Sequence, residues 1–154
     1  MSQWITDRTY ADVIRVQEIS EKAKTNTWTE EEQAEWAAGM KGALSYLDYN
    51  RIENGMQEIA TFLRASISVK MDWDANGYIT TADAARWIHN VKILRALCSG
   101  KSDTPGTPDA IEELHFSVIN QVEQILSDIE AIANDRSLYC SEPICGGEPY
   151  YALC

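Results

Sequence analysis

The spacing of apolar residues along the chain predicts five helices. Apolar positions recur every third or fourth residue over residues 9–24, 30–44, 48–63, 81–97 and 108–136, which is the α-helical period. Polar or Gly- and Pro-containing stretches separate these runs. We therefore expect an all-α fold: a compact helical bundle of about five helices, with a long C-terminal helix and an extended non-helical tail.

Local signals mark where several of these helices begin. Thr29 followed by Glu32 predicts a capping box, in which each side chain bonds to the backbone of the other residue. Thr107 as N-cap and Pro108 in the first turn predict the start of the last helix. The candidate caps of the third and fourth helices are Asp48 and either Thr80 or Thr81.

Each predicted helix carries an apolar face. The first presents Tyr10, Val13 and Ile14, and the third presents Ile52, Met56, Ile59 and Leu63. The fourth carries Ala84, Trp87, Ile88, Val91, Leu94 and Leu97. The near-heptad stripe of the last helix is Ile111, Leu114, Val118, Val122, Ile125, Ile129 and Ile132. Two interpretations of that stripe stay open: antiparallel packing against the third and fourth helices, or self-association of several copies.

These patterns divide the chain into four parts. Residues 1–98 form an N-terminal helical domain, 99–107 a linker, 108–136 the long helix, and 137–154 an extended Pro/Gly tail. Pro143 and Pro149 are incompatible with a helix in the tail. Tyr150, Tyr151 and Leu153 give it apolar groups, so we expect it to dock on a partner.

The net charge and the cysteines indicate which ligands and partners are not expected. The formal net charge of −11 disfavours binding to nucleic acid and to anionic membranes. No apolar run is long enough to span a bilayer, and the N-terminus has no features of a secretory signal. Cys98 is expected to be a small buried apolar residue, and Cys140, Cys145 and Cys154 lack the spacing of a zinc site. A Cys140–Cys145 disulfide remains an alternative.

One stretch, DWDANGYITTAD at residues 72–83, fits the pattern of a calcium-binding EF-hand loop. Oxygen ligands are expected at positions 1, 3, 5, 7 and 12 of such a loop, with glycine at position 6. The residues in these places are Asp72, Asp74, Asn76, Gly77, Tyr78 and Asp83. The alternative is a turn at Asn76–Gly77 followed by a helix cap formed by Thr80 and Asp83.

Three ordered motifs, covering about residues 4–97, resemble a family of short prophage proteins of Gram-positive bacteria that are encoded among tail and baseplate genes. The first motif, DRTYADV, contributes Asp7, Arg8, Thr9, Ala11, Asp12 and Val13. The second contributes Gly39, Lys41, Gly42, Ala43, Tyr46, Asp48, Asn50, Arg51 and Glu53. The third contributes Asp72, Trp73, Thr80, Arg86, Trp87, Asn90, Val91 and Arg95. The resemblance implies that the 72–83 segment is a turn between helices, with one bound calcium ion as the alternative.

The resemblance also implies a function. It indicates a structural adaptor at the baseplate or tail tip of a phage tail or tail-like particle, made in the host bacterial cytoplasm and located in the virion. Partners would be other tail or baseplate proteins and copies of the same chain, not nucleic acid, membrane or a small-molecule substrate. We expect no enzyme activity, no cofactor and no metal. The expected assembly residues are Trp4, Ile125, Ile129, Ile132, Tyr150, Tyr151 and Leu153.

Overall fold

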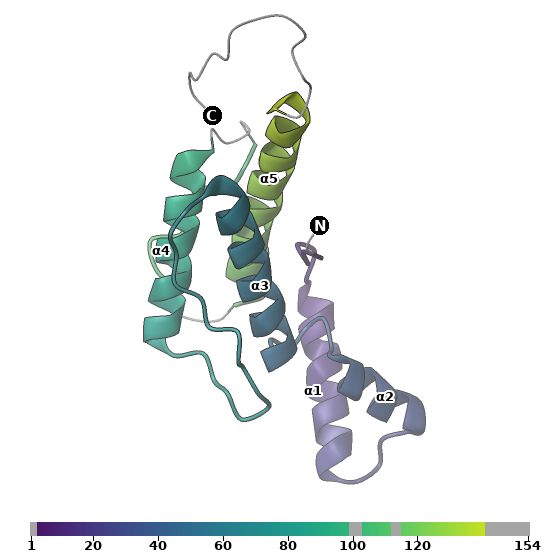
Figure 1. Cartoon of the computed structure of the whole chain (residues 1–154). Coiled ribbons are helices and arrows are strands. Elements are labelled where there is room, and N and C mark those ends of the chain that lie inside the picture. The colour runs from purple at the N-terminus through teal and green to yellow at the C-terminus, as the bar shows by residue number, and fades with distance from the viewer. Residues whose placement is uncertain (1–2, 99–102, 112–114, 141–154) are drawn as a thin grey trace, which may run out of the picture.

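The computed structural model describes residues 3–98, 103–111 and 115–140, the last five of these by their backbone alone. The helices are α1 (Tyr10–Lys24), α2 (Glu30–Ala38), α3 (Tyr46–Leu63), α4 (Thr81–Leu97) and α5 (Phe116–Cys140) (Figure 1). Within these ranges there is no strand, so the predicted all-α class is confirmed. None of the described helices combines the length and apolar character that a membrane span requires.

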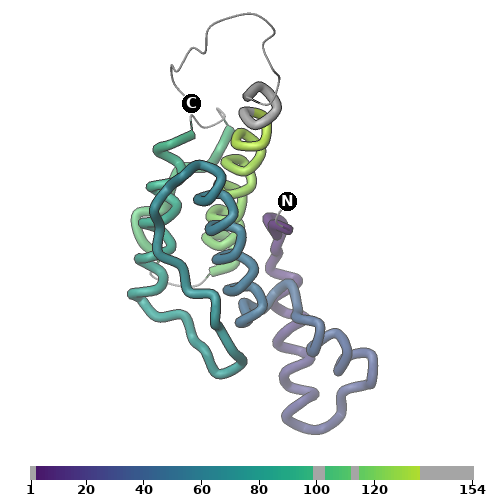
Figure 2. Tube along the Cα trace, viewed as in Figure 1, coloured from purple at the N-terminus to yellow at the C-terminus, as the bar shows by residue number. Residues whose placement is uncertain are grey.

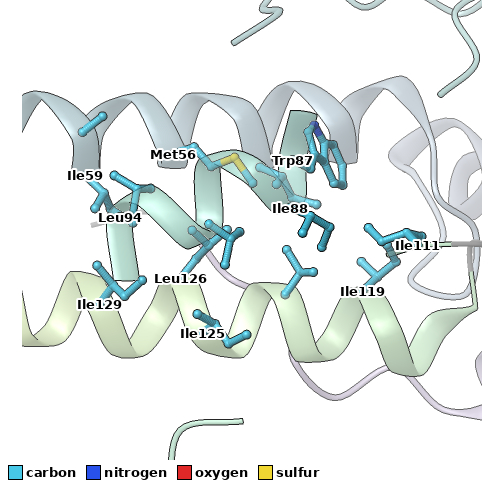
Figure 3. Close-up of a cluster of buried hydrophobic side chains, with 14 of the residues drawn as sticks. Met56, Ile59, Trp87, Ile88, Leu94, Ile111, Ile119, Ile125, Leu126 and Ile129 are labelled. Atoms are coloured by element: carbon cyan, nitrogen blue, oxygen red, sulfur yellow. The ribbon is translucent and has the colours of Figure 1, made fainter. Parts of the chain in front are cut away.

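Helices α3, α4 and α5 pack side by side and all run in the same direction. Glu53 of α3 bonds to Arg86 of α4, and one turn later Met56 lies beside Asn90, so the two helices advance together. In Figure 3, Ile59, Leu94 and Ile129 lie at one end of the shared core. The expected partners of the last helix are therefore correct, but its expected antiparallel direction is wrong.

Long connecting segments make the parallel arrangement possible. A short turn would force neighbouring helices to be antiparallel, but residues 64–80 return along the bundle before α4 begins (Figure 2). From Ala65 to Lys70, partly buried residues alternate with exposed ones, which is the period of an extended chain. Ala65, Ile67 and Val69 pack against the helical core.

The apolar stripes meet in one core between α3, α4 and α5 (Figure 3). Ile125 and Ile129 of α5 are 0% and 2% exposed, and Ile132 packs beside them. This packing within one chain agrees with the first interpretation of the stripe in its partners, α3 and α4, but not in its direction. Cys98 is buried, as predicted. The other wholly buried apolar side chains include Ile52, Met56, Trp87, Val91, Leu94, Ile119, Val122 and Leu126.

Helices α1 and α2 form a hairpin that projects beyond the start of α3 (Figure 1). The predicted capping box of Thr29 and Glu32 is present. Helix α2 ends at Ala38, earlier than predicted, because Gly39 turns the chain with a φ of +87°. Ile19 is the buried residue of α1, whereas Tyr10, expected on the apolar face, is 67% exposed.

Three other predicted helix boundaries need comment. Thr80 caps α4, as one of the two alternatives predicted, but Ser45 and not Asp48 is the N-cap of α3. Helix α5 begins at Phe116, not at residue 108, and the Thr107 hydroxyl accepts a hydrogen bond from Arg95. The same helix continues to Cys140, so the tail predicted from residue 137 is helical over its first four residues. Tyr150, Tyr151 and Leu153 lie outside the described residues.

Gly42 provides a test of how the hairpin is attached to the rest of the chain. A Cβ atom at Gly42 would lie 2.1 Å from the backbone oxygen of Asp12, whereas one at Gly106 would have no atom within 4 Å. We predict that Gly42→Ala lowers the free energy of unfolding by about 1–3 kcal/mol, because the two backbones must separate. The control Gly106→Ala should change it by less than about 0.5 kcal/mol. Urea unfolding followed by circular dichroism measures both, and equal midpoints for the two variants would contradict the contact.

Candidate functional site

Two carboxylates are completely buried where helices meet. Glu53 on α3 and Glu123 on α5 are both 0% exposed. A buried carboxylate destabilises a fold unless charged groups and hydrogen-bond donors surround it. The surroundings of these two side chains therefore show what the chain's interior is built to do.

Glu123 joins the N-terminal segment to α3 and α5. It pairs with Arg8 at 2.8 Å and with both terminal nitrogens of Arg51, at 2.5 and 3.0 Å. It also accepts the backbone N–H of Ile5 at 2.7 Å. Asp48 completes this group by binding the same two arginines, at 3.2 and 2.9 Å. Two carboxylates and two guanidinium groups thus balance their charges in one cluster.

Glu53 joins α3 to α4 in a similar way. The guanidinium of Arg86 donates two hydrogen bonds to its two oxygens, each 2.7 Å long. The indole N–H of Trp87 donates a third at 2.7 Å, and the backbone N–H of Lys70 donates a fourth at 3.0 Å. Bidentate arginine pairs of this kind are among the stronger polar contacts in proteins. Glu53 therefore fixes both the neighbouring helix and the segment that leads to it.

Three asparagines pair with the backbone of an extended segment as a neighbouring strand would. In each pair the side-chain amide donates to the C=O of one residue and accepts from its N–H. Asn50 pairs with Trp73 at 2.9 and 3.2 Å, and Asn120 pairs with Arg8 at 2.8 and 3.2 Å. Asn90 pairs with Ser68 at 2.7 and 3.3 Å. Backbone groups that have no sheet partner are satisfied in this way.

Two arginines of these clusters are held in their ionised forms. The hydrogen bond to Glu53 raises the pKa of Arg86, and Asp83 adds to the effect. Burial acts to lower the pKa of Arg51, but Glu123 and Asp48 outweigh it and the pKa is raised. These arginines therefore act as fixed ion-pair partners. Four donors bond to the oxygens of Glu53, and two arginines and one backbone N–H bond to the oxygens of Glu123. Both carboxylates therefore serve as structural anchors.

The structure arranges residues 72–83 as a turn followed by a helix cap. Asp74 accepts the backbone N–H of Asn76 through its side chain and that of Gly77 through its carbonyl. Gly77 does not have a left-handed φ, and a Cβ there would lie 3.1 Å from the Trp73 ring. Trp73 itself is buried.

The carboxylate expected at position 12 of a calcium loop has other partners here. One oxygen of Asp83 accepts from the N–H and hydroxyl of Thr80, and the other pairs with Arg86. Burial raises the pKa of Asp83, but the bonds from Thr80 and Arg86 outweigh it and lower the pKa. Among the described residues, no three His, Cys, Asp or Glu side chains come together as a possible metal-binding group. Calcium binding stays the untested alternative, and Asp83 is engaged with Thr80 and Arg86.

Four of the expected assembly residues lie in the described part of the chain: Trp4, Ile125, Ile129 and Ile132. Trp4 is partly buried, and its indole N–H donates to Glu130 at 2.8 Å. Ile125 and Ile129 lie inside the core of a single chain, with Ile132 at its edge. These four residues therefore lie in or against one core of a single chain, whereas Tyr150, Tyr151 and Leu153 lie outside the described residues.

Sequence reasoning missed the role of Glu123 and Asn120. Both lie within the apolar stripe of α5, where Ile119 and Val122 are wholly buried beside them. For Glu123 the sequence does carry a signal: a charged residue flanked by buried positions of a helix indicates a buried ion pair, because a buried charge needs a partner. Residue spacing does not reveal that the partners are Arg8 and Arg51, far away in the sequence.

A substitution at Glu123 tests the first cluster. Glu123→Gln removes the charge that balances Arg8, whose side chain is 1% exposed. We expect the free energy of unfolding to fall by roughly 3 kcal/mol. The control Glu21→Gln affects an ion pair with Lys24 that is mostly exposed, and should cost less than about 1 kcal/mol. Similar urea midpoints for both variants would show that the buried cluster does not stabilise the fold.

Calorimetric titration with calcium tests the metal alternative. Because Asp83 is engaged with Thr80 and Arg86, we expect no binding heat and no change of melting temperature at millimolar calcium. Asp72→Ala serves as the matched variant, since Asp72 is exposed and would be the first ligand of the loop. A rise in melting temperature that Asp72→Ala abolishes would establish a calcium site.

Comparison with protein-family models, with curated proteins and with solved structures finds no match to this chain. The resemblance to prophage tail proteins therefore rests on the motif residues themselves. Their place in the structure is known: Arg8, Asp48, Asn50, Glu53 and Arg86 all belong to the polar clusters. Function is accordingly inferred from these residues and from the surfaces that the fold leaves exposed.

Proposed function

We propose that the chain is a structural adaptor of a phage tail or tail-like particle, located at the baseplate or tail tip. It would act through contacts with other tail proteins and with copies of itself. In this role it carries out no reaction and needs no cofactor. The virion is its proposed location after synthesis in the bacterial cytoplasm.

One observation carries the proposal: the polar residues behind the resemblance are the residues that hold the fold together. Arg8 and Arg51 meet at Glu123, Arg86 meets Glu53, and Asn90 holds the segment before α4. A set of shared residues that fixes a scaffold is what a particle component requires, because its surfaces must keep their relative positions. An enzyme family would be expected to share residues around a reaction site instead.

The exposed aromatic residues of the projecting hairpin also support an adaptor role. Trp36 is 42% exposed and packs edge-on against Trp28, while Tyr10 is 67% exposed. Large aromatic side chains frequently anchor protein interfaces. The hairpin stands away from the α3–α5 core, where another protein could contact it from several sides (Figure 1).

Locating the chain in a particle tests the proposal. Prophage induction in the source bacterium, density-gradient purification of particles and gold-labelled antibodies against this chain would be combined in electron microscopy. We expect the label at one end of the tail, in several copies per particle. Recovery of the chain only in the fraction of free proteins, with unlabelled tails, would contradict the adaptor role.

A further inference from the structure

The chain contains two Asn-Gly dipeptides, and the fold places them in different backbone conformations. Asn54–Gly55 lies in the middle of α3. Asn76–Gly77 lies in a turn of the loop that projects beyond the start of α4 (Figure 1). In other respects the two asparagine side chains are alike. Both are exposed with respect to the described residues, and none of those residues bonds to either side-chain amide.

An asparagine that precedes glycine can lose its side-chain amide without an enzyme. The backbone nitrogen of the glycine attacks the side-chain carbonyl carbon of the asparagine, and no Cβ atom on the glycine obstructs the approach. The attack requires a backbone that can leave its hydrogen-bonded conformation and bring these two atoms together. A helix opposes it, because each N–H bonds to the carbonyl four residues earlier and the dihedral angles are fixed.

Short-range contacts hold the turn at Asn76–Gly77. The Gly77 N–H donates to the Asp74 carbonyl at 2.9 Å, and the Asn76 N–H donates to the Asp74 carboxylate at 2.9 Å. Asp74 and Asn76 are both exposed in the described part of the chain. Opening these two bonds uncovers little apolar surface, so the turn opens locally at a low cost in free energy.

Opening α3 at Asn54–Gly55 disturbs the core. Gly55 is buried, and Met56 beside it is 0% exposed. On the other side Glu53 is held by the guanidinium of Arg86 from α4. The backbone at Asn54 is therefore released only when the packing of the three helices is lost, which is a much rarer event than the opening of a turn.

We propose that Asn76 is a site of spontaneous deamidation, with water as the only co-reactant. In the first step the Gly77 nitrogen bonds to Cγ of Asn76, its proton passes to the leaving amide group, and ammonia departs from a five-membered cyclic imide. In the second step water opens the imide. Breaking the bond from the nitrogen to Cγ gives aspartate, whereas breaking the bond from the nitrogen to the main-chain carbonyl carbon gives isoaspartate, in which the chain runs through Cβ.

The modification changes the turn in two ways, whatever the function of the chain. It adds a negative charge near Asp74, in a chain whose formal net charge is already −11. Isoaspartate also lengthens the backbone by one carbon atom before Gly77. Gly77 lies close to the buried Trp73, since a Cβ atom there would be 3.1 Å from the ring. The bond from Gly77 to Asp74 and this close packing must therefore readjust.

Ageing of the purified full chain at physiological temperature and neutral pH tests the proposal. Trypsin cleaves after lysine and arginine, so residues 52–64 and 71–86 form separate peptides, and each contains one asparagine. Mass spectrometry of the two peptides should show that Asn76 reacts at least about tenfold faster than Asn54. In urea, where both dipeptides are unfolded, the two rates should become similar. The aged 71–86 peptide should contain isoaspartate as well as aspartate, because direct hydrolysis of the amide yields aspartate alone.

Two variants serve as matched controls. Asn76→Gln should abolish the reaction in residues 71–86, since glutamine would have to close a larger ring. Asn54→Gln should leave the rate at Asn76 unchanged. On an anion exchanger, a more acidic form should accumulate with time in the unmodified chain and in Asn54→Gln, and much more slowly in Asn76→Gln.

Three outcomes would overturn the proposal. Equal rates at Asn54 and Asn76 in the folded chain would show that the backbone conformation does not select the site. An Asn76 that stays intact in the folded chain but reacts in urea would show that the turn protects it. Aspartate without isoaspartate at position 76 would exclude the cyclic imide.

Discussion

Three helices that run in the same direction need connecting segments that return along the bundle, and the backbones of those segments need hydrogen-bond partners. Here the partners are side chains of the helices. Glu53 and Asn90 hold the segment between α3 and α4, while Glu123 and Asn120 hold the segment before α1. The parallel bundle and its buried polar groups are therefore linked, since the segments that the bundle requires are the ones to which these groups bond.

This solution explains why so many charged residues are buried in a chain of this size. A buried ion pair adds little stability compared with apolar packing, but removing one partner is costly. The Arg8–Glu123 and Arg86–Glu53 pairs consequently specify which segments lie together more than they add to stability. The apolar core alone would permit α5 to shift along its neighbours, whereas the Arg51–Glu123 pair is formed only at one register.

Sequence reasoning succeeded where the signal is local. The capping boxes at Thr29 and Thr80 depend on residues three positions apart, and the core stripe of α3 depends on one helical period. It failed where a distant residue decides the outcome. Thr107 was expected to start a helix, but its hydroxyl accepts a hydrogen bond from Arg95. Likewise, the direction of α5 depends on contacts with residues more than seventy positions away, which spacing along one helix does not encode.

Native-state amide hydrogen exchange tests the central claim most directly. The N–H groups of Ile5, Ser68, Lys70 and Trp73 lie in segments outside the helices and bond to side chains of α3, α4 and α5. If those bonds hold the bundle together, these amides should exchange only through the same cooperative opening as the buried centre of α3. Exchange at the rate of an unstructured peptide, while the helices remain protected, would show that the connecting segments are loosely attached and that the helices pack without them.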